Sequence, residues 1–262
     1  MTNIEKYAPG SFCWVELCTT DQNAAKSFYS SLFGWGVNDS PLGPGEFYSM
    51  FKLEGRDAGA AYTMGKEQRA QGVPSHWNIY IAVESADAAA DRAAKLGGKA
   101  LAPAFDVFDV GRMANIQDPT GATFAVWQAK QHKGMGITGV DGTLCWADLS
   151  TSDPAEASKF YTGLFGWKIA ASENDPSGYL HIQNGENFIG GVPPAMYRDP
   201  NVPPNWLLYF LTSNCDATAA KAKQLGAKVN IEPMTIENVG RMAILADPQG
   251  AVFSIFQPSP RK

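Results

Sequence analysis

The second half of the chain repeats motifs of the first half in the same order, and this internal repeat constrains the fold more than any other feature of the sequence. A repeat of this length means that each copy is a folding unit built on one plan. A glycine-bearing stretch at 134–142 separates the copies. We therefore predict one domain over 1–133, a linker over 134–142 and a second domain over 143–262. The matching segments are Trp14–Leu17 with Trp146–Leu149, Leu32–Trp35 with Leu164–Trp167, Val110–Ala114 with Val239–Ala243, and Asp118–Ala122 with Asp247–Ala251.

Within each copy, the hydrophobic pattern predicts a strand, a helix and further strands, twice over. Asp21 is placed to cap the first helix, which should end near Gly34. In the second copy Asp153, Pro154 and Glu156 have the spacing of a capping box with proline at the first helical position. Each copy therefore reads βαβββ–βαβββ, which makes the chain an α+β protein of four modules. In the first copy we expect strands at 12–19, 47–53, 59–64, 77–83, 112–116 and 123–127, and a second helix at 86–96.

This order of elements, with its Leu-Phe-Gly-Trp helix ends and Asp-Pro-x-Gly turns, resembles the glyoxalase / bleomycin resistance protein / extradiol dioxygenase (vicinal oxygen chelate) superfamily. The resemblance covers nearly the whole chain. It points in particular to a tandem two-domain glyoxalase-like branch that includes a mycobacterial secreted-antigen type protein. It implies that two modules pair so that curled mixed sheets surround a cleft holding a ligand and often a divalent metal. The chain would then carry two clefts.

The resemblance also implies where metal ligands would lie, on the first and last strands of each module, as histidine or glutamate. Such sites need several convergent nitrogen or oxygen ligands. No histidine or carboxylate occupies a corresponding position in either copy, so we expect no metal ligand and no cofactor. The positions hold Trp14 and Trp146, Asn78 and Leu207, Ala125 and Ser254, and Ala60–Ala61 or Gly190–Gly191.

Two carboxylates are the candidate catalytic residues. Strand alternation places Phe12, Trp14, Glu16 and Cys18 on the cleft face, and the second copy offers Asp148 at the position of Glu16. A carboxylate among aromatic side chains is costly to bury unless it is paired, and it can then serve as a general acid or base. The alternatives are an ion pair to Arg112 or Arg241, or partial solvation at the cleft mouth.

The remaining candidates would line the clefts and bind a ligand. Trp14 and Trp146 could instead fill the core, and the two arginines could bind an anionic group or hold the Asp-Pro-x-Gly turn. His76 is more often a wall residue than a base, and the spacing of His132 and His181 predicts no cluster. The first cleft is the more polar and is favoured if only one is active. The candidate ligand-binding residues are Trp14, His76, Asn78, Tyr80, Arg112, Trp127, Trp146, Tyr209 and Arg241.

Composition limits the kinds of partner that we expect the chain to bind. The net charge is −5 and there is no basic block, which argues against nucleic acid and anionic membranes. The sequence shows no apolar run long enough to span a membrane and no signal peptide. The cysteines form no CxxC pair, which is typical of a reduced cytoplasmic protein. Since one chain supplies all four modules, we expect a monomer or a weak homodimer.

These observations favour a metal-independent protein of the glyoxalase/bleomycin-resistance type that binds a small organic ligand for resistance, sequestration or sensing. The alternative is a lyase, isomerase or hydrolase that acts on a small carbonyl or aromatic compound with Glu16 or Asp148 as acid/base. A third reading is an interaction protein whose clefts are closed by Trp14 and Trp146. The missing ligands disfavour metal-dependent glyoxalase or dioxygenase activity.

Overall fold

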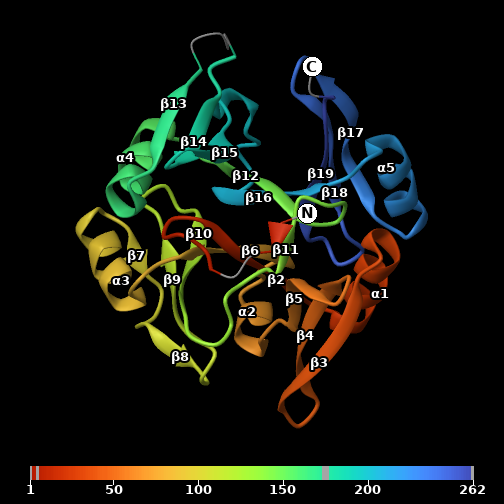
Figure 1. Cartoon of the computed structure of the whole chain (residues 1–262), viewed down its shortest axis with the longest axis horizontal. Coiled ribbons are helices and arrows are strands. Elements are labelled where there is room, and N and C mark those ends of the chain that lie inside the picture. The colour runs from red at the N-terminus through yellow and green to blue at the C-terminus, as the bar shows by residue number, and fades with distance from the viewer. Residues whose placement is uncertain (1, 4–5, 173–176, 261–262) are drawn as a thin grey trace.

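The computed structural model describes residues 2–3, 6–172 and 177–260. Each copy of the repeat forms one large mixed sheet. The first sheet has the order β3-β4-β5-β2-β6-β10-β9-β7, with β8 paired to β9, and the second has the order β13-β14-β15-β12-β16-β19-β18-β17. The first sheet lies in the lower part of Figure 1 and the second in the upper part. No helix of the described residues is long and apolar enough to cross a membrane.

The elements of the two domains follow the repeat. The first domain contains β2 (Phe12–Thr19), α1 (Gln22–Phe33), β3 (Gly36–Gly43), β4 (Glu46–Leu53), β5 (Arg56–Thr63), α2 (Lys66–Ala70), β6 (His76–Ala82), α3 (Ala86–Lys95), β7 (Lys99–Ala100), β8 (Phe105–Val107), β9 (Gly111–Gln117) and β10 (Thr123–Ala129). The second contains β12 (Leu144–Ser150), α4 (Pro154–Phe165), β13 (Lys168–Ala171), β14 (Leu180–Asn184), β15 (Asn187–Val192), η1 (Ala195–Tyr197), β16 (Asn205–Leu211), α5 (Cys215–Gln224), β17 (Lys228–Ile236), β18 (Gly240–Ala246) and β19 (Val252–Pro258).

The first strands of paired modules join the two halves of each sheet. β2 runs antiparallel to β6 and parallel to β5, while β6 runs parallel to β10. β12 has the same relations to β16 and β15 in the second domain. The strands from both modules thus form one curled, unclosed sheet, and the α+β class with four βαβββ modules is confirmed.

The long helices begin and end where the sequence predicts. The Asp21 side chain accepts a hydrogen bond from the Ala24 N–H, and Gly34 ends α1 with φ at 73°. Asp153 likewise accepts from the N–H of Glu156, with Pro154 in the first turn of α4. A left-handed C-cap of this kind suits glycine, because glycine has no Cβ to clash.

The two domains share one core through reciprocal contacts. The Tyr29 hydroxyl on α1 donates to Asp247 Oδ2 at 3.1 Å, and Tyr161 on α4 donates to Asp118 Oδ2 at 3.0 Å. Each aspartate also accepts backbone N–H bonds within its own Asp-Pro-x-Gly turn. Helix α1 lies against α5, and α4 lies against α3, on opposite sides of the molecule (Figure 1). The tyrosine of each copy therefore contacts the turn of the other copy.

Several features differ from the sequence-based expectations, among them the short elements α2, β7 and β8, which were not predicted. Strand β3 was not predicted, because its side chains are exposed and carry no alternating pattern. The linker contains β11 (Ile137–Thr138), which pairs with β1 (Thr2–Asn3). The placement of Phe12 on the cleft face is wrong. A β-bulge between Phe12 and Trp14 shifts the register, and Phe12 packs against Trp167 and Trp206 of the other domain.

Candidate functional site

A buried carboxylate lies on the cleft face of each domain. In the first domain Tyr80 donates a hydrogen bond to Glu16 Oε1 at 2.5 Å, and Tyr48 donates to Oε2 at 2.9 Å. Asn78 lies directly opposite Glu16 on the neighbouring strand β6, and its side chain acts to lower the pKa of this carboxyl group. The Trp14 Nε1–H donates to the Tyr48 hydroxyl at 2.9 Å. Neighbouring strands thus place three aromatic side chains around one acid.

The second domain repeats this arrangement around Asp148. Tyr179 donates to Oδ1 at 2.5 Å and Tyr209 donates to Oδ2 at 2.8 Å. The Trp146 Nε1–H lies 3.0 Å from Asp148 Oδ1 and 2.8 Å from the Tyr179 hydroxyl. The two shortest hydrogen bonds satisfy the carboxylate without an arginine or lysine. A copied cluster of this kind can hold a proton within a hydrogen-bonded network.

Burial dominates the electrostatics of both clusters. Desolvation raises the pKa of Glu16 and of Asp148, while the hydrogen bonds from the tyrosines act to lower it. The pKa of Tyr80 and that of Tyr209 are also raised, first by burial and then by the adjacent carboxylate. The acid is therefore the group in each cluster that gains or loses a proton most readily, as general acid/base chemistry requires.

The first cleft is closed by the chain itself. Trp14 is only 4% exposed and Glu16 only 7%. The ring of His132, from the end of the first domain, packs edge-on against Trp14 with centroids 4.4 Å apart. Trp127 Nε1–H donates to the His132 carbonyl oxygen at 3.0 Å, and the Met135 N–H donates to the Cys13 carbonyl oxygen at 2.8 Å. The preference for the first cleft, made on the grounds of its polarity, stays a prediction, and the packing of His132 and Met135 against the first strand argues against it.

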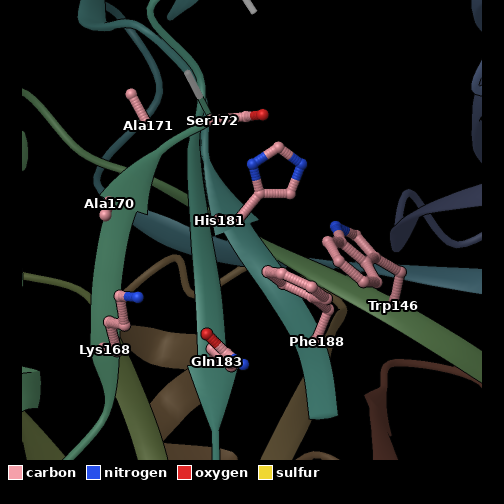
Figure 2. Close-up of a pocket in the computed structure, with 8 residues that line it drawn as sticks. All are labelled: Trp146, Lys168, Ala170, Ala171, Ser172, His181, Gln183 and Phe188. Atoms are coloured by element: carbon pink, nitrogen blue, oxygen red, sulfur yellow. The ribbon is translucent and has the colours of Figure 1, made fainter. Parts of the chain in front are cut away.

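The second domain has an open pocket of about 490 Å³ beside Trp146. Strands β12 to β15 supply its walls, and the His181 ring projects into it between Trp146 and Ser172 (Figure 2). Asp148 is 6% exposed and lies behind Trp146, whose indole N–H reaches the Asp148 carboxylate. The lining residues are Trp146, Lys168, Ala170, Ala171, Ser172, His181, Gln183 and Phe188.

The two candidate arginines lie outside the clefts. Arg112 forms a bidentate ion pair with Asp87 in the first turn of α3, with N–O distances of 2.7 and 2.8 Å. Arg241 pairs in the same way with Asp216 on α5. Among the residues that the structure describes, neither arginine pairs with Glu16 or Asp148, and neither hydrogen-bonds to an Asp-Pro-x-Gly turn. His76 Nδ1 lies 2.8 Å from the Pro74 carbonyl oxygen at the rim.

Several cleft residues were missed from the sequence. Tyr48 and Tyr179 complete the carboxylate clusters, and His181, Phe188 and Lys168 line the pocket. A signal existed for His181, because His181 and Gln183 alternate along one strand and so share a face. Nothing in the pattern of residues ranked that strand above the others.

The residues present do not fit the metal that the fold implies. Trp14 and Trp146 occupy the first-strand positions, and an indole N–H is a donor with no lone pair to offer. Ser254 donates its hydroxyl to the Ala243 carbonyl oxygen at 2.8 Å. A Cβ at Gly190 would lie 2.3 Å from the Ala147 carbonyl oxygen, so that position excludes any side chain. Within the described ranges, no three histidine, cysteine, aspartate or glutamate side chains converge.

Comparisons with known proteins agree with this architecture. The chain is 44% identical over 269 residues to "Putative glyoxylase CFP32" of Mycobacterium bovis, covering all of both chains. It is 34% identical over 273 residues to "Anthracycline biosynthesis protein DauV" of Streptomyces sp., covering 97% of this chain and 95% of that protein.

A Mn(II)-bound glyoxalase from Novosphingobium aromaticivorans has a similar fold. Its TM-score is 0.66 at 16% identity, and the match covers 95% of this chain and 82% of that one. The family described as Glyoxalase/Bleomycin resistance protein/Dioxygenase superfamily matches at residues 11–126 and again at 143–255. The chain therefore belongs to the glyoxalase/bleomycin resistance protein/dioxygenase superfamily, with one family unit in each half.

Proposed function

We propose that the chain binds a small organic molecule in the pocket of its second domain, without a metal at the positions the family uses. The observation that carries this proposal is the open pocket beside Trp146. Its volume of about 490 Å³ lies in the range of roughly 300–1,000 Å³ typical of ligand sites. The tryptophan, phenylalanine and histidine side chains in its wall favour a flat, unsaturated ligand.

The exposure of Phe188 supports a ligand site at this position. Its side chain is 60% exposed, although it stands on a strand beside Trp146 and His181 (Figure 2). A planar ring placed against Phe188 and Trp146 would remove apolar surface from water. The relative named for anthracycline biosynthesis is consistent with a polycyclic aromatic ligand. Sequestration, resistance and sensing would all use such binding.

A second candidate function is an enzyme that uses Asp148 as the acid/base. Burial raises the pKa of Asp148, and its hydrogen bonds to Trp146 and Tyr179 connect it to residues at the pocket. Glu16 has the same local chemistry, but its cleft is covered by the His132 segment. An Asp148→Asn variant that binds ligand as the wild type does but loses turnover would favour this candidate.

A matched pair of phenylalanine variants tests the binding proposal. The probes are anthraquinone-2-carboxylate and its neutral carboxamide, and tryptophan fluorescence quenching measures their affinity. Phe188→Ala should weaken binding about 5- to 150-fold, because an aromatic side chain accounts for about 1–3 kcal/mol of burial and stacking. Phe108→Ala is the control, since Phe108 is 71% exposed and lies in the first domain. The proposal fails if neither probe binds, or if Phe188→Ala binds as tightly as the control.

A monomer is part of the same proposal. Each sheet takes both of its modules from one chain, so no second copy is required to complete a cleft. Sedimentation equilibrium across the concentrations used for binding should give the mass of a single chain. A stable dimer would contradict it.

A further inference from the structure

Among the described residues that line the second-domain pocket, the ionisable side chains are Lys168 and His181. Lys168 forms no ion pair with the residues that the structure describes, and the His181 ring makes no hydrogen bond with them. The described lining therefore offers two nitrogen groups that can meet an oxygen atom of a ligand.

At the related positions of the first domain, a lysine is paired with an aspartate. Lys52 lies four residues after Tyr48, and it forms an ion pair with Asp57 at 2.5 Å. The second domain has Gln183 four residues after Tyr179. Phe188 stands where Asp57 stands, three residues before the glycine or alanine that pairs with the cleft carboxylate. The second domain has therefore lost that internal ion pair and carries an aromatic ring in its place.

The strand register places the basic groups together. On the β13–β14 pair, Lys168 is opposite Gln183 and Ala170 is opposite His181. Lys168 and His181 are thus diagonal neighbours on one face, with backbones about 7–8 Å apart. A lysine side chain spans that gap, so both groups can reach one carboxylate or phenolate. The aromatic side of the pocket lies beyond His181, whose ring centroid is 5.7 Å from that of Phe188.

We propose that this pocket selects a planar aromatic anion, a compound whose ring system packs against Trp146 and Phe188 and whose carboxylate or phenolate oxygen lies between Lys168 and His181. This inference rests on the proposed function and adds the charge of the ligand to it. Lys168 is exposed in the free protein. A bound ring would shield its ammonium from water and so strengthen the ion pair.

The two anthraquinone probes separate charge from shape because they share the same rings. Anthraquinone-2-carboxylate should bind about tenfold more tightly than the carboxamide, which corresponds to about 1.4 kcal/mol. Lys168→Met should remove most of that preference and change the affinity for the carboxamide less than twofold. Lys228→Met is the matched control, because Lys228 is an exposed lysine on β17 and is not part of the pocket lining. Raising the salt concentration should weaken the binding of the carboxylate probe and leave the binding of the carboxamide unchanged.

The outcomes distinguish this inference from the proposed function. If both probes bind equally and both depend on Phe188, the pocket binds aromatic ligands but the assignment of an anion is overturned. If Lys168→Met weakens both probes to the same extent, the lysine contributes shape rather than charge, and the assignment is again overturned. If neither probe binds, the proposed function is overturned, and this inference is overturned with it.

Discussion

Replacing Glu16 by glutamine should flatten the pH dependence of stability. Burial raises the pKa of Glu16 in the folded protein, whereas in the unfolded chain the pKa is about 4.3. Between those two values the unfolded state has released the proton and the folded state has kept it. Stability is therefore fully present at low pH and falls as pH rises through this window. One such group contributes a slope of up to about 1.4 kcal/mol per pH unit.

At pH 4 the wild type should be more stable than the Glu16→Gln variant. At this pH the protonated Glu16 carboxyl can accept from Tyr80 and Tyr48 through its carbonyl and hydroxyl oxygens, whereas glutamine has one acceptor oxygen and an amide nitrogen that can only donate. The variant should therefore be less stable by about 1 kcal/mol, the net value of one hydrogen bond. The gap should narrow as pH rises and can reverse by pH 8. Urea unfolding followed by far-UV circular dichroism gives both curves, and Glu237→Gln at an exposed position is the control. Parallel curves for wild type and Glu16→Gln from pH 4 to 8 would refute the reasoning.

Three further outcomes follow from the fold and the site. Tyr161→Phe removes a hydroxyl that accepts from Trp206 Nε1 and donates to Asp118. It should lower the free energy of unfolding by about 2–5 kcal/mol, as measured by chemical denaturation. A loss under about 0.5 kcal/mol, the lower end of the value of one hydrogen bond, would count against the shared core. Gly190→Ala forces a Cβ to within 2.3 Å of the Ala147 carbonyl oxygen. It should lower the thermal midpoint of unfolding by several degrees, which corresponds to about 1–3 kcal/mol. An unchanged midpoint would contradict the close approach of β12 and β15 at this position. Dialysis against EDTA should change probe affinity less than twofold, whereas loss of binding restored by Mn(II) would contradict metal-independent binding.

The sequence was a good guide to the fold because the fold depends on local and periodic signals. The caps at Asp21 and Asp153 set the helix starts, and the alternation in 12–19 set the first strand. Strand β3 escaped notice because an exposed edge strand needs no apolar face. The position of Phe12 was wrong because a single bulge turns a side chain to the opposite face of a sheet, and no residue type announces the bulge.

The site was less predictable, because it depends on which segments cover the sheets. The family resemblance pointed to the positions of Trp14 and Trp146, strand alternation then placed Glu16 beside Trp14, and the repeat gave Asp148. The difference between the clefts comes from the segment at the end of the first domain and the start of the linker, where Met135 hydrogen-bonds to Cys13 and His132 packs on Trp14. Its edge-on contact joins elements far apart in the sequence, and nothing in the linker composition specifies it. The place of His181 in the pocket wall likewise became clear only from the strand register, which brings its ring beside that of Phe188.

The most direct test of the central claim is the stoichiometry of binding by metal-free protein. Isothermal titration calorimetry of the EDTA-treated chain with anthraquinone-2-carboxylate measures the number of sites and their affinity together. An open pocket beside Trp146 and a closed cleft at Trp14 predict one site per chain, which Phe188→Ala weakens and Phe108→Ala leaves unchanged. Two equivalent sites per chain, or binding that appears only after a divalent metal is added, would contradict the account.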